Sequence, residues 1–150
     1  MKFRKAVRED VPAIIEMIVD DDLGKLRENP QDPLPKEYYR AFESIDSNED
    51  QELIVVEQEG KIIGTMQLTF LQYLTYQGGI RAQIEAVRIH RSQRGKGLGE
   101  TFLQWAIDHA KERGVHLIQL TTDKKRPEAL KFYEKLGFKA SHEGMKLHFK

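Results

Sequence analysis

The stretch from Ile84 to Gly114, "IEAVRIHRSQRGKGLGETFLQWAIDHAKERG", decides how this chain is interpreted, because a cluster of glycines joins two kinds of secondary structure. Residues 80–90 have the composition of a strand. The segment that follows the glycines is apolar along one side until Gly114, as expected for a helix that a glycine ends. Glycine weakens both helices and strands, so this cluster needs a local reason.

An anion-binding loop is one such reason. The first backbone N–H groups of a helix have no intrahelical partners, and the helix dipole is positive at that end. Gly95, Gly97 and Gly99 let backbone approach an anion closely, and Arg94 and Lys96 add positive charge. The competing interpretation is a flexible, solvated turn.

Two common phosphate-binding motifs do not fit these residues. A Walker A loop needs Ser or Thr after Gly-Lys, but Lys96 is followed by Gly97. The dinucleotide fingerprint G-x-G-x-x-G needs glycine at position 100, which is Glu100. The pattern that fits is R-x-x-G-x-G, formed by Arg94, Gly97 and Gly99.

With this pattern, the stretch resembles the central motif of the GNAT superfamily of acetyl-CoA-dependent N-acetyltransferases. The segment "RPEALKFYEKLGFKA" (126–140) resembles the second signature of that family, N-x-x-A-x-x-F-Y-x-x-x-G-F. It departs from the signature at Arg126, where Asn is common, so a contact from Arg126 to a coenzyme A phosphate replaces the usual Asn contact in this interpretation. The signature residues it keeps are Ala129, Phe132, Tyr133, Gly137 and Phe138.

The resemblance implies acetyl-CoA as co-substrate, with its pyrophosphate on the glycine loop. It also implies that backbone around Val87 contacts the pantetheine arm and that the Val87 amide faces the thioester carbonyl. The cofactor-binding residues expected on this basis are Val87, Arg88, Ile89, Arg94, Gly95, Lys96, Gly97, Leu98, Gly99, Glu100, Arg126, Ala129, Phe132 and Tyr133.

Acetyl transfer to an amine needs a base for the amine and benefits from an acid for the departing thiolate. Glu85 is the candidate base, acting directly or through water, because a carboxylate is unusual within a strand and desolvation there would improve it as a base. The alternative is a solvent-facing or salt-bridged Glu85, with Arg81 or Arg88 as partner. Tyr133 lies on the apolar face of the last helix, where a core role is the simpler interpretation; the resemblance implies that it protonates the thiolate.

Strands and helices alternate along the whole chain. We expect a strand at 1–7, helices at about 10–22 and 36–47, a hairpin at 52–74, a strand at 80–90, a helix to about 113, a strand at 115–122, a helix at 126–136 and a strand at 146–150. The fold class is therefore α/β with a mixed, mostly antiparallel sheet, helices on both faces and a parallel strand pair splayed at the cofactor, as in the GNAT fold. Residues 1–150 are expected to form one N-acetyltransferase domain.

The amino-acid composition limits the classes of partner expected for this protein. Basic and acidic residues number 24 each, so no overall basic field favours nucleic acid. There is no cysteine, no metal-ligand spacing among the five histidines, no apolar signal segment and no membrane-length apolar run, which predicts a cytoplasmic protein without metal. The run from Asp20 to Asp22 is either a solvated helix end or an acidic rim that attracts a cationic amine.

The sequence leaves three questions open. The acceptor is expected to be a small-molecule or peptide amine, but its identity is not encoded in a motif. Homodimers are frequent in families that resemble this chain, and no residue pattern selects one here. The alternative function is a non-catalytic acyl-CoA-binding sensor of the same fold.

Overall fold

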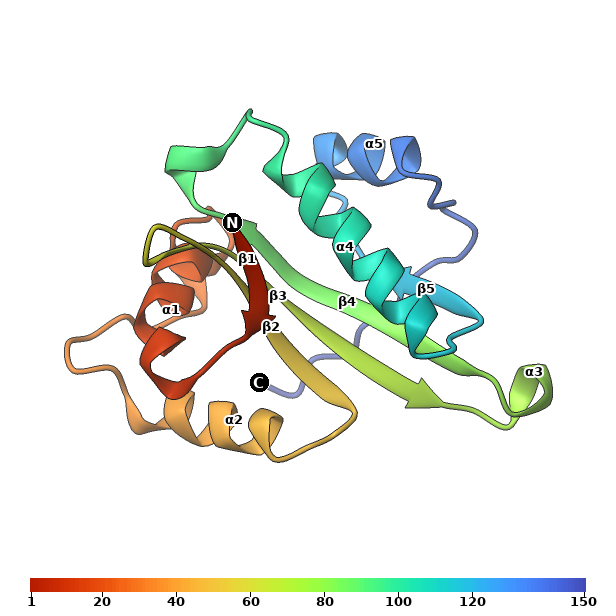
Figure 1. Cartoon of the computed structure of the whole chain (residues 1–150), viewed down its shortest axis with the longest axis horizontal. Coiled ribbons are helices and arrows are strands. Elements are labelled where there is room, and N and C mark those ends of the chain that lie inside the picture. Colours follow the sequence, from red (N-terminus) through yellow and green to blue (C-terminus); the bar gives the residue numbers. More distant parts are fainter. The chain divides into compact units, whose positions relative to one another are not determined.

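A five-stranded sheet forms the centre of the computed structural model, which describes residues 1–150 (Figure 1). Neighbouring strands in the first four positions are antiparallel, and the last strand lies parallel beside the fourth. The predicted mixed, mostly antiparallel sheet is therefore confirmed. In sheet order the strands are β1 (Lys2–Lys5), β2 (Gln51–Gln58), β3 (Lys61–Gln72), β4 (Ile80–Ile89) and β5 (Leu117–Leu120).

Five α-helices connect or follow these strands, and the chain divides into two compact units. The first unit, residues 1–119, holds most of the sheet, and the second unit, residues 120–150, holds the last helix. The helices are α1 (Val11–Val19), α2 (Lys36–Asp46), α3 (Thr75–Gly78), α4 (Leu98–Glu112) and α5 (Pro127–Lys135).

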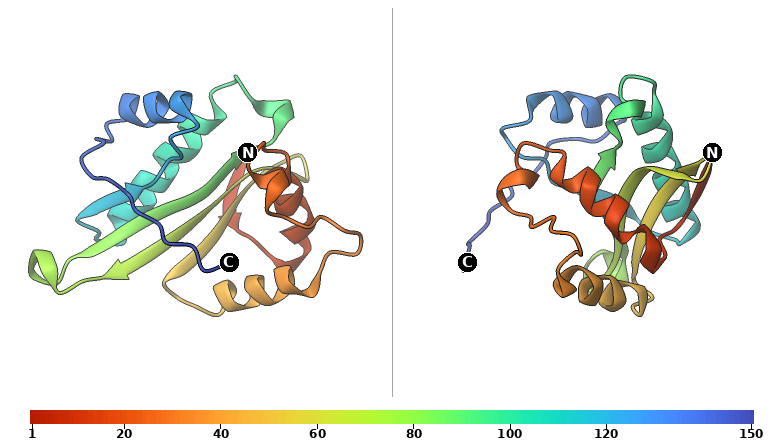
Figure 2. Two further views of the ribbon diagram at one scale, coloured as in Figure 1. Left: turned by 180° about the vertical axis from the view of Figure 1, so that it is seen from behind. Right: turned by 90° about the vertical axis from the view of Figure 1, so that its left-hand side faces the viewer.

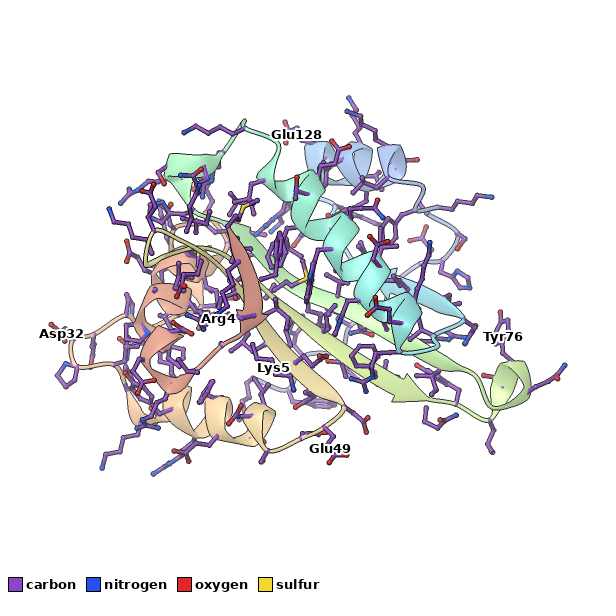
Figure 3. The ribbon with its side chains drawn as sticks, viewed as in Figure 1. Arg4, Lys5, Asp32, Glu49, Tyr76 and Glu128 are labelled. Carbon is purple, nitrogen blue, oxygen red and sulfur yellow. The ribbon has the colours of Figure 1, made fainter.

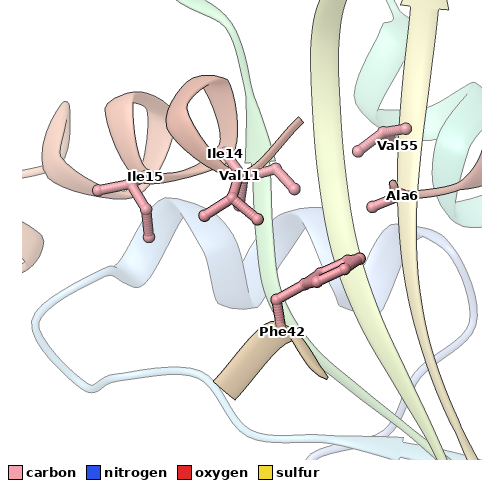
Figure 4. Packing of buried hydrophobic residues seen from close by; sticks show 6 residues of the cluster. All are labelled: Ala6, Val11, Ile14, Ile15, Phe42 and Val55. Carbon is pink, nitrogen blue, oxygen red and sulfur yellow. The ribbon is translucent and has the colours of Figure 1, made fainter. Parts of the chain in front are cut away.

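One face of the sheet in the first unit packs against α1 and α2. Val55 of β2 is completely buried there, among Val11, Ile14 and Ile15 of α1 and Phe42 of α2 (Figure 4). These α1 residues follow helical spacing, which puts them on one side of the helix. Burial of this apolar stripe, more than intrinsic helix propensity, stabilises a helix as short as α1.

The opposite face packs against α4. Ile54 and Val56 alternate with Val55 along β2, so their side chains point to the other side of the sheet. There the ring of Phe3, which pairs with Val56, lies 5.7 Å from the ring of Phe102, a fully buried residue of α4. Figure 2 shows α1 and α4 on opposite sides of the strands, which confirms helices on both faces.

A buried carboxylate on this second face is a feature that no sequence pattern indicated. Glu52 of β2 is 4% exposed, and its two carboxylate oxygens lie 2.9 and 3.0 Å from Nε2 of His109. Arg113 donates to the same carboxylate at 3.5 Å, and the ring of Trp105 stacks on His109 with 4.8 Å between centroids. These contacts satisfy a charge that would otherwise be costly to bury.

The termini differ from the sequence-based expectation. The strand expected at 146–150 is wrong, because residues 139–150 form no regular element, and Met145, Leu147 and Phe149 are exposed. The first strand covers only Lys2–Lys5 of the expected 1–7, since Ala6 and Val7 already lead into the turn before α1. The predicted break after the hairpin contains the short helix α3, in which Tyr76 and Gln77 have positive φ.

An ion pair between β1 and the start of α1 connects the first strand to the first helix. Arg4 donates to both oxygens of Asp10 at 2.7 and 3.2 Å and to Glu57 of β2 at 2.9 Å (Figure 3 labels Arg4). Burial raises the pKa of Asp10, but the bonds from Arg4 and from the Val7 amide outweigh it and leave this pKa below its usual value.

Replacing this carboxylate tests the connection. Because the pKa of Asp10 is lowered, its stabilising contribution is complete above the unfolded value of about 3.9 and is lost as the pH falls through the folded value. We expect Asp10→Asn to lower the free energy of unfolding by roughly 1–3 kcal/mol at pH 7. The difference from the unmutated protein should shrink below about pH 4 in denaturant titrations at several pH values. Asp46→Asn, which removes an exposed carboxylate, is the control; equal effects of the two variants would contradict the assignment.

Candidate functional site

A bulge in β4 shapes the backbone around the candidate base. Glu85 pairs with Gln67 of β3 and Arg88 pairs with Thr65, so two residues of β4, Ala86 and Val87, lie opposite one residue of β3. Ala86 takes up the extra length with φ of +54°, a conformation that L-residues other than glycine seldom adopt. The bulge interrupts the ladder beside Val87, the residue expected to face the thioester carbonyl.

Glu85 lies immediately before this bulge, and its side chain is exposed. The desolvation expected for it is not found, so burial is not what would make it a base. Its Oε1 instead accepts a hydrogen bond from Nε2 of Gln83, two residues earlier on the same face of β4. Arg88, one of the two salt-bridge partners considered for Glu85, lies 3.5 Å from a carboxylate oxygen of Asp21.

The glycine loop follows β4 and opens α4. A turn of 3-10 helix at Arg91–Gln93 leads into Gly95 and Gly97, which have φ of +75° and +83°. No atom lies within 4 Å of where a Cβ would stand on either glycine, so the backbone there is open to solvent.

The amides at the start of α4 suit an anion. Thr101 is the first residue whose amide bonds back along the helix, to the carbonyl of Gly97 at 3.1 Å. Gly97 at the N-cap has no side chain that could accept from the amides before Thr101. Open glycines, unused amides and the adjacent Arg94 and Lys96 therefore fit the diphosphate of coenzyme A.

The acidic run after α1 turns toward this loop. Asp20 lies 3.4 Å from Nη2 of Arg94 through both its Oδ2 and its carbonyl oxygen, and Asp21 faces Arg88. Asp22 is fully exposed and lies 3.8 Å from Lys25. Two of the three carboxylates thus face arginines expected to bind cofactor and do not form an open acidic rim.

A tight turn holds these carboxylates in place. The Gly24 amide donates to Oδ2 of Asp21 at 3.0 Å, and a Cβ on Gly24 would overlap the carbonyl oxygen of Ile18. Any residue larger than glycine would push the turn away from the end of α1.

The remaining predicted site residues lie in the second unit. Arg126 is the N-cap of α5, with Pro127 at its first position, and α5 ends before Gly137, whose φ is +102°. The half-buried Tyr133 ring makes edge contacts with Phe132 and Phe138, with centroids 5.4 and 5.8 Å away. The amide of Phe138 donates to the Tyr133 carbonyl at 3.1 Å, which fixes the end of the helix.

The bulge at Ala86 and the bond from Gln83 to Glu85 differ in how far the sequence indicates them. Alanine does not favour positive φ, so nothing in the sequence pointed to the bulge at Ala86. Gln83 lies two positions before Glu85, and the period of a strand puts it on the same face, so the sequence could have indicated it as a partner of Glu85.

The structure contains no group of three His, Cys, Asp or Glu side chains able to hold a metal ion. None of its helices combines the length and apolarity that a membrane span requires.

The mixed sheet with helices on both faces, the bulged fourth strand and the open glycine loop are consistent with an acyltransferase. The model of the acetyltransferase (GNAT) family matches residues 15–138, and this chain belongs to that family as an N-acetyltransferase.

Individual relatives agree over nearly the whole chain. A structure from Bacillus halodurans C-125, described as a transcriptional regulator, is 54% identical, with a TM-score of 0.96 and 99% of each chain covered. The glucosamine-6-phosphate N-acetyltransferase of Arabidopsis thaliana is 29% identical with a TM-score of 0.80, over 99% of this chain and 98% of that one. Aminoalkylphosphonate N-acetyltransferase of Salmonella typhimurium is 26% identical, over 94% of this chain and 86% of the relative.

The bulge can be tested through the conformation of Ala86. The side chain of Ala86 is exposed, so substitutions there change backbone strain more than packing. We expect Ala86→Val to lower the free energy of unfolding by about 1–2 kcal/mol and Ala86→Gly to raise it by up to about 1 kcal/mol, as measured by urea titration. Ala41→Gly, on the exposed side of α2, should instead cost about 1 kcal/mol. Loss of stability in both glycine variants would argue against a left-handed Ala86.

Proposed function

We propose that this N-acetyltransferase moves the acetyl group of acetyl-CoA directly to the primary amine of a small acceptor that also carries a phosphonate or phosphate group. The observation that carries the proposal is the exposed Glu85 beside the bulge of β4, on the strand that leads into the open glycine loop.

The glycine loop has the binding role. Acetyl-CoA supplies an acetyl thioester, which is reactive toward an uncharged amine. The amides at the start of α4, with Arg94 and Lys96, would hold its diphosphate, and backbone of Val87, Arg88 and Ile89 would hold the pantetheine arm. The amides at the start of α4 that would bind the diphosphate are those of Leu98, Gly99 and Glu100.

Glu85 would accept the proton that the amine must lose. Amines are protonated at neutral pH, and only the uncharged form has a lone pair for the carbonyl carbon. As an exposed carboxylate, Glu85 can take this proton directly or through a water molecule, and then pass it to solvent.

The Val87 amide and Tyr133 would serve the other two needs of the reaction. The amide would donate to the carbonyl oxygen as negative charge grows there. As the C–N bond forms and the C–S bond breaks, the Tyr133 hydroxyl would give its proton to the departing sulfur and recover one from solvent. Arg126, Ala129 and Phe132 of the same segment would contact the cofactor.

The acceptor class is supported by two relatives. One acts on aminoalkylphosphonates and the other on glucosamine 6-phosphate, and each of these substrates has an amine and a phosphorus oxyanion in one small molecule. Thiol release should therefore be measured with 2-aminoethylphosphonate and glucosamine 6-phosphate. Ethanolamine and glucosamine are the matched acceptors without the oxyanion, and equal rates with and without it would refute this acceptor class.

The Tyr133→Phe variant distinguishes an enzyme from a non-catalytic sensor of the same fold. The sensor is the alternative to test because the Bacillus halodurans relative is described as a transcriptional regulator. We expect the variant to bind coenzyme A with unchanged affinity in calorimetry, while kcat falls by roughly 100-fold or more because the thiolate leaves unprotonated. Coenzyme A binding without turnover by the unmutated protein on any tested amine would favour the sensor. Failure of the unmutated protein to bind coenzyme A would overturn the role of the glycine loop.

Asp20→Asn tests whether the acidic run competes with the cofactor. The Asp20 carboxylate faces Arg94 and would repel the diphosphate, so its removal should tighten coenzyme A binding by about 2- to 5-fold. Asp22→Asn, with the same charge change two residues away, should alter affinity much less because Asp22 pairs with Lys25. Calorimetry at low salt measures both; weaker binding in Asp20→Asn would mean that Asp20 helps to orient Arg94.

A further inference from the structure

A chain of hydrogen bonds crosses from β4 to β5 and back, and it ends on Glu85. Nη1 of Arg81 donates to Oε1 of Gln119 at 3.1 Å, and Nε2 of Gln119 donates to Oε1 of Gln83 at 2.9 Å. Nε2 of Gln83 then donates to Oε1 of Glu85. Arg81, Gln83 and Glu85 alternate along β4, so all three lie on the same face of the sheet.

The direction of this chain is set at its two ends. A guanidinium can only donate hydrogen bonds, and an ionised carboxylate can only accept them. Each glutamine amide between them therefore has one orientation that satisfies both neighbours, with its oxygen toward Arg81 and its NH₂ group toward Glu85. The hydrogen bonds therefore run in one direction, from the Arg81 guanidinium to the Glu85 carboxylate.

The far end of the chain is itself held in place. The Arg81 guanidinium lies over the ring of Tyr73, 4.6 Å from its centroid, and 5.3 Å from the centroid of Tyr76. Tyr76, labelled at the end of the long hairpin in Figure 3, stacks on His116 with 4.6 Å between centroids. Arg81 is thus fixed between the segment that contains α3 and the residue Gln119 of β5.

We infer that Arg81, Gln119 and Gln83 are positioning residues that hold the exposed Glu85 carboxylate in one orientation. The inference rests on the proposed function, in which Glu85 is the base. An exposed Glu side chain without such bonds samples several rotamers, and only some of them direct the carboxylate at the acceptor amine. Because Glu85 is exposed, burial does not restrict it, and the bond from Gln83 is what orients its carboxylate.

The first experiment asks whether the chain of hydrogen bonds exists, and it does not require turnover. Side-chain amide signals of Gln83 and Gln119 are recorded by ¹H–¹⁵N NMR in the unmutated protein and in Glu85→Gln, with the signals assigned by substitution. We expect both signals to shift in Glu85→Gln, because loss of the carboxylate acceptor weakens the bond from Gln83 and, through Gln83, the bond from Gln119. A shift of the Gln83 signal alone, or of neither signal, would overturn the hydrogen-bond chain.

The second experiment asks whether the chain acts on catalysis. Gln119→Leu removes the link, and Gln119→Glu accepts from Arg81 but cannot donate to Gln83. Both should lower kcat/KM at pH 7 by roughly 10- to 100-fold with the best acceptor of the panel, with the loss in kcat. Gln104→Leu is the control, because the exposed Gln104 bonds Asp108 on α4, away from these residues.

A double substitution separates failure of this inference from failure of the proposed function. If Glu85→Gln leaves kcat unchanged, Glu85 is not the base and the proposed function is wrong. If Glu85→Gln is slow and Gln119→Leu slows it further by the full single-variant factor, the chain does not act through Glu85. Should the Gln119 variants fail to bind coenzyme A, Arg81→Met provides the same test from the other end. Arg81→Lys, which keeps a donor, should restore most of the lost rate, and equal losses in the two Arg81 variants would count against positioning.

Discussion

The left-handed backbone at Ala86 is the constraint on which the site depends. A regular β4 would pair along its whole length with β3 and would leave no backbone group free beside Val87. The bulge adds one residue to β4 opposite β3, so Glu85 keeps its place opposite Gln67 while the ladder beside Val87 is interrupted. The surrounding sheet stabilises this strained backbone because it is firmly packed, with Ile84 and Ala82 of β4 buried on the α4 face.

The two faces of the sheet divide the work. Toward α4, the sheet is apolar and closely packed apart from Glu52, and this packing fixes the helix that follows the glycine loop. On the other face, β4 carries Arg81, Gln83 and Glu85, and β5 adds Gln119. The period of two along a strand makes this division possible, since one segment can supply apolar core residues on one side and polar side chains on the other.

Sequence reasoning reached the fold and family because the evidence was local. The glycine loop, the second signature and the alternation of elements are short-range patterns, and the mixed sheet and the helices on both faces agree with them. The terminal strand failed because residues 146–150 alternate as a strand would, and alternation alone does not provide a pairing partner. The environment of Glu85 could not be predicted for a similar reason: whether a strand carboxylate is buried, and whether Gln119 comes within reach of Gln83, depend on strand order. Asp20 illustrates the same limit, because its arginine partner is 74 positions away.

The turn at Gly24 separates two parts of the segment between α1 and α2. Up to residue 24 the backbone is clamped against the end of α1, and further on the Tyr38 hydroxyl holds the chain again by accepting from the Asn29 amide at 2.8 Å. Residues 30–33, which follow Asn29, are exposed and include the prolines at 30 and 33. Leu34 packs against the core cluster of α1 and α2, and the Pro35 carbonyl accepts from the Tyr38 amide, so these two residues belong to the scaffold. Changes of length or sequence in 30–33 therefore leave both clamps intact, together with the carboxylates that face Arg94 and Arg88. For a laboratory that wishes to graft loops from related enzymes, residues 30–33 are where an exchange would disturb the scaffold least.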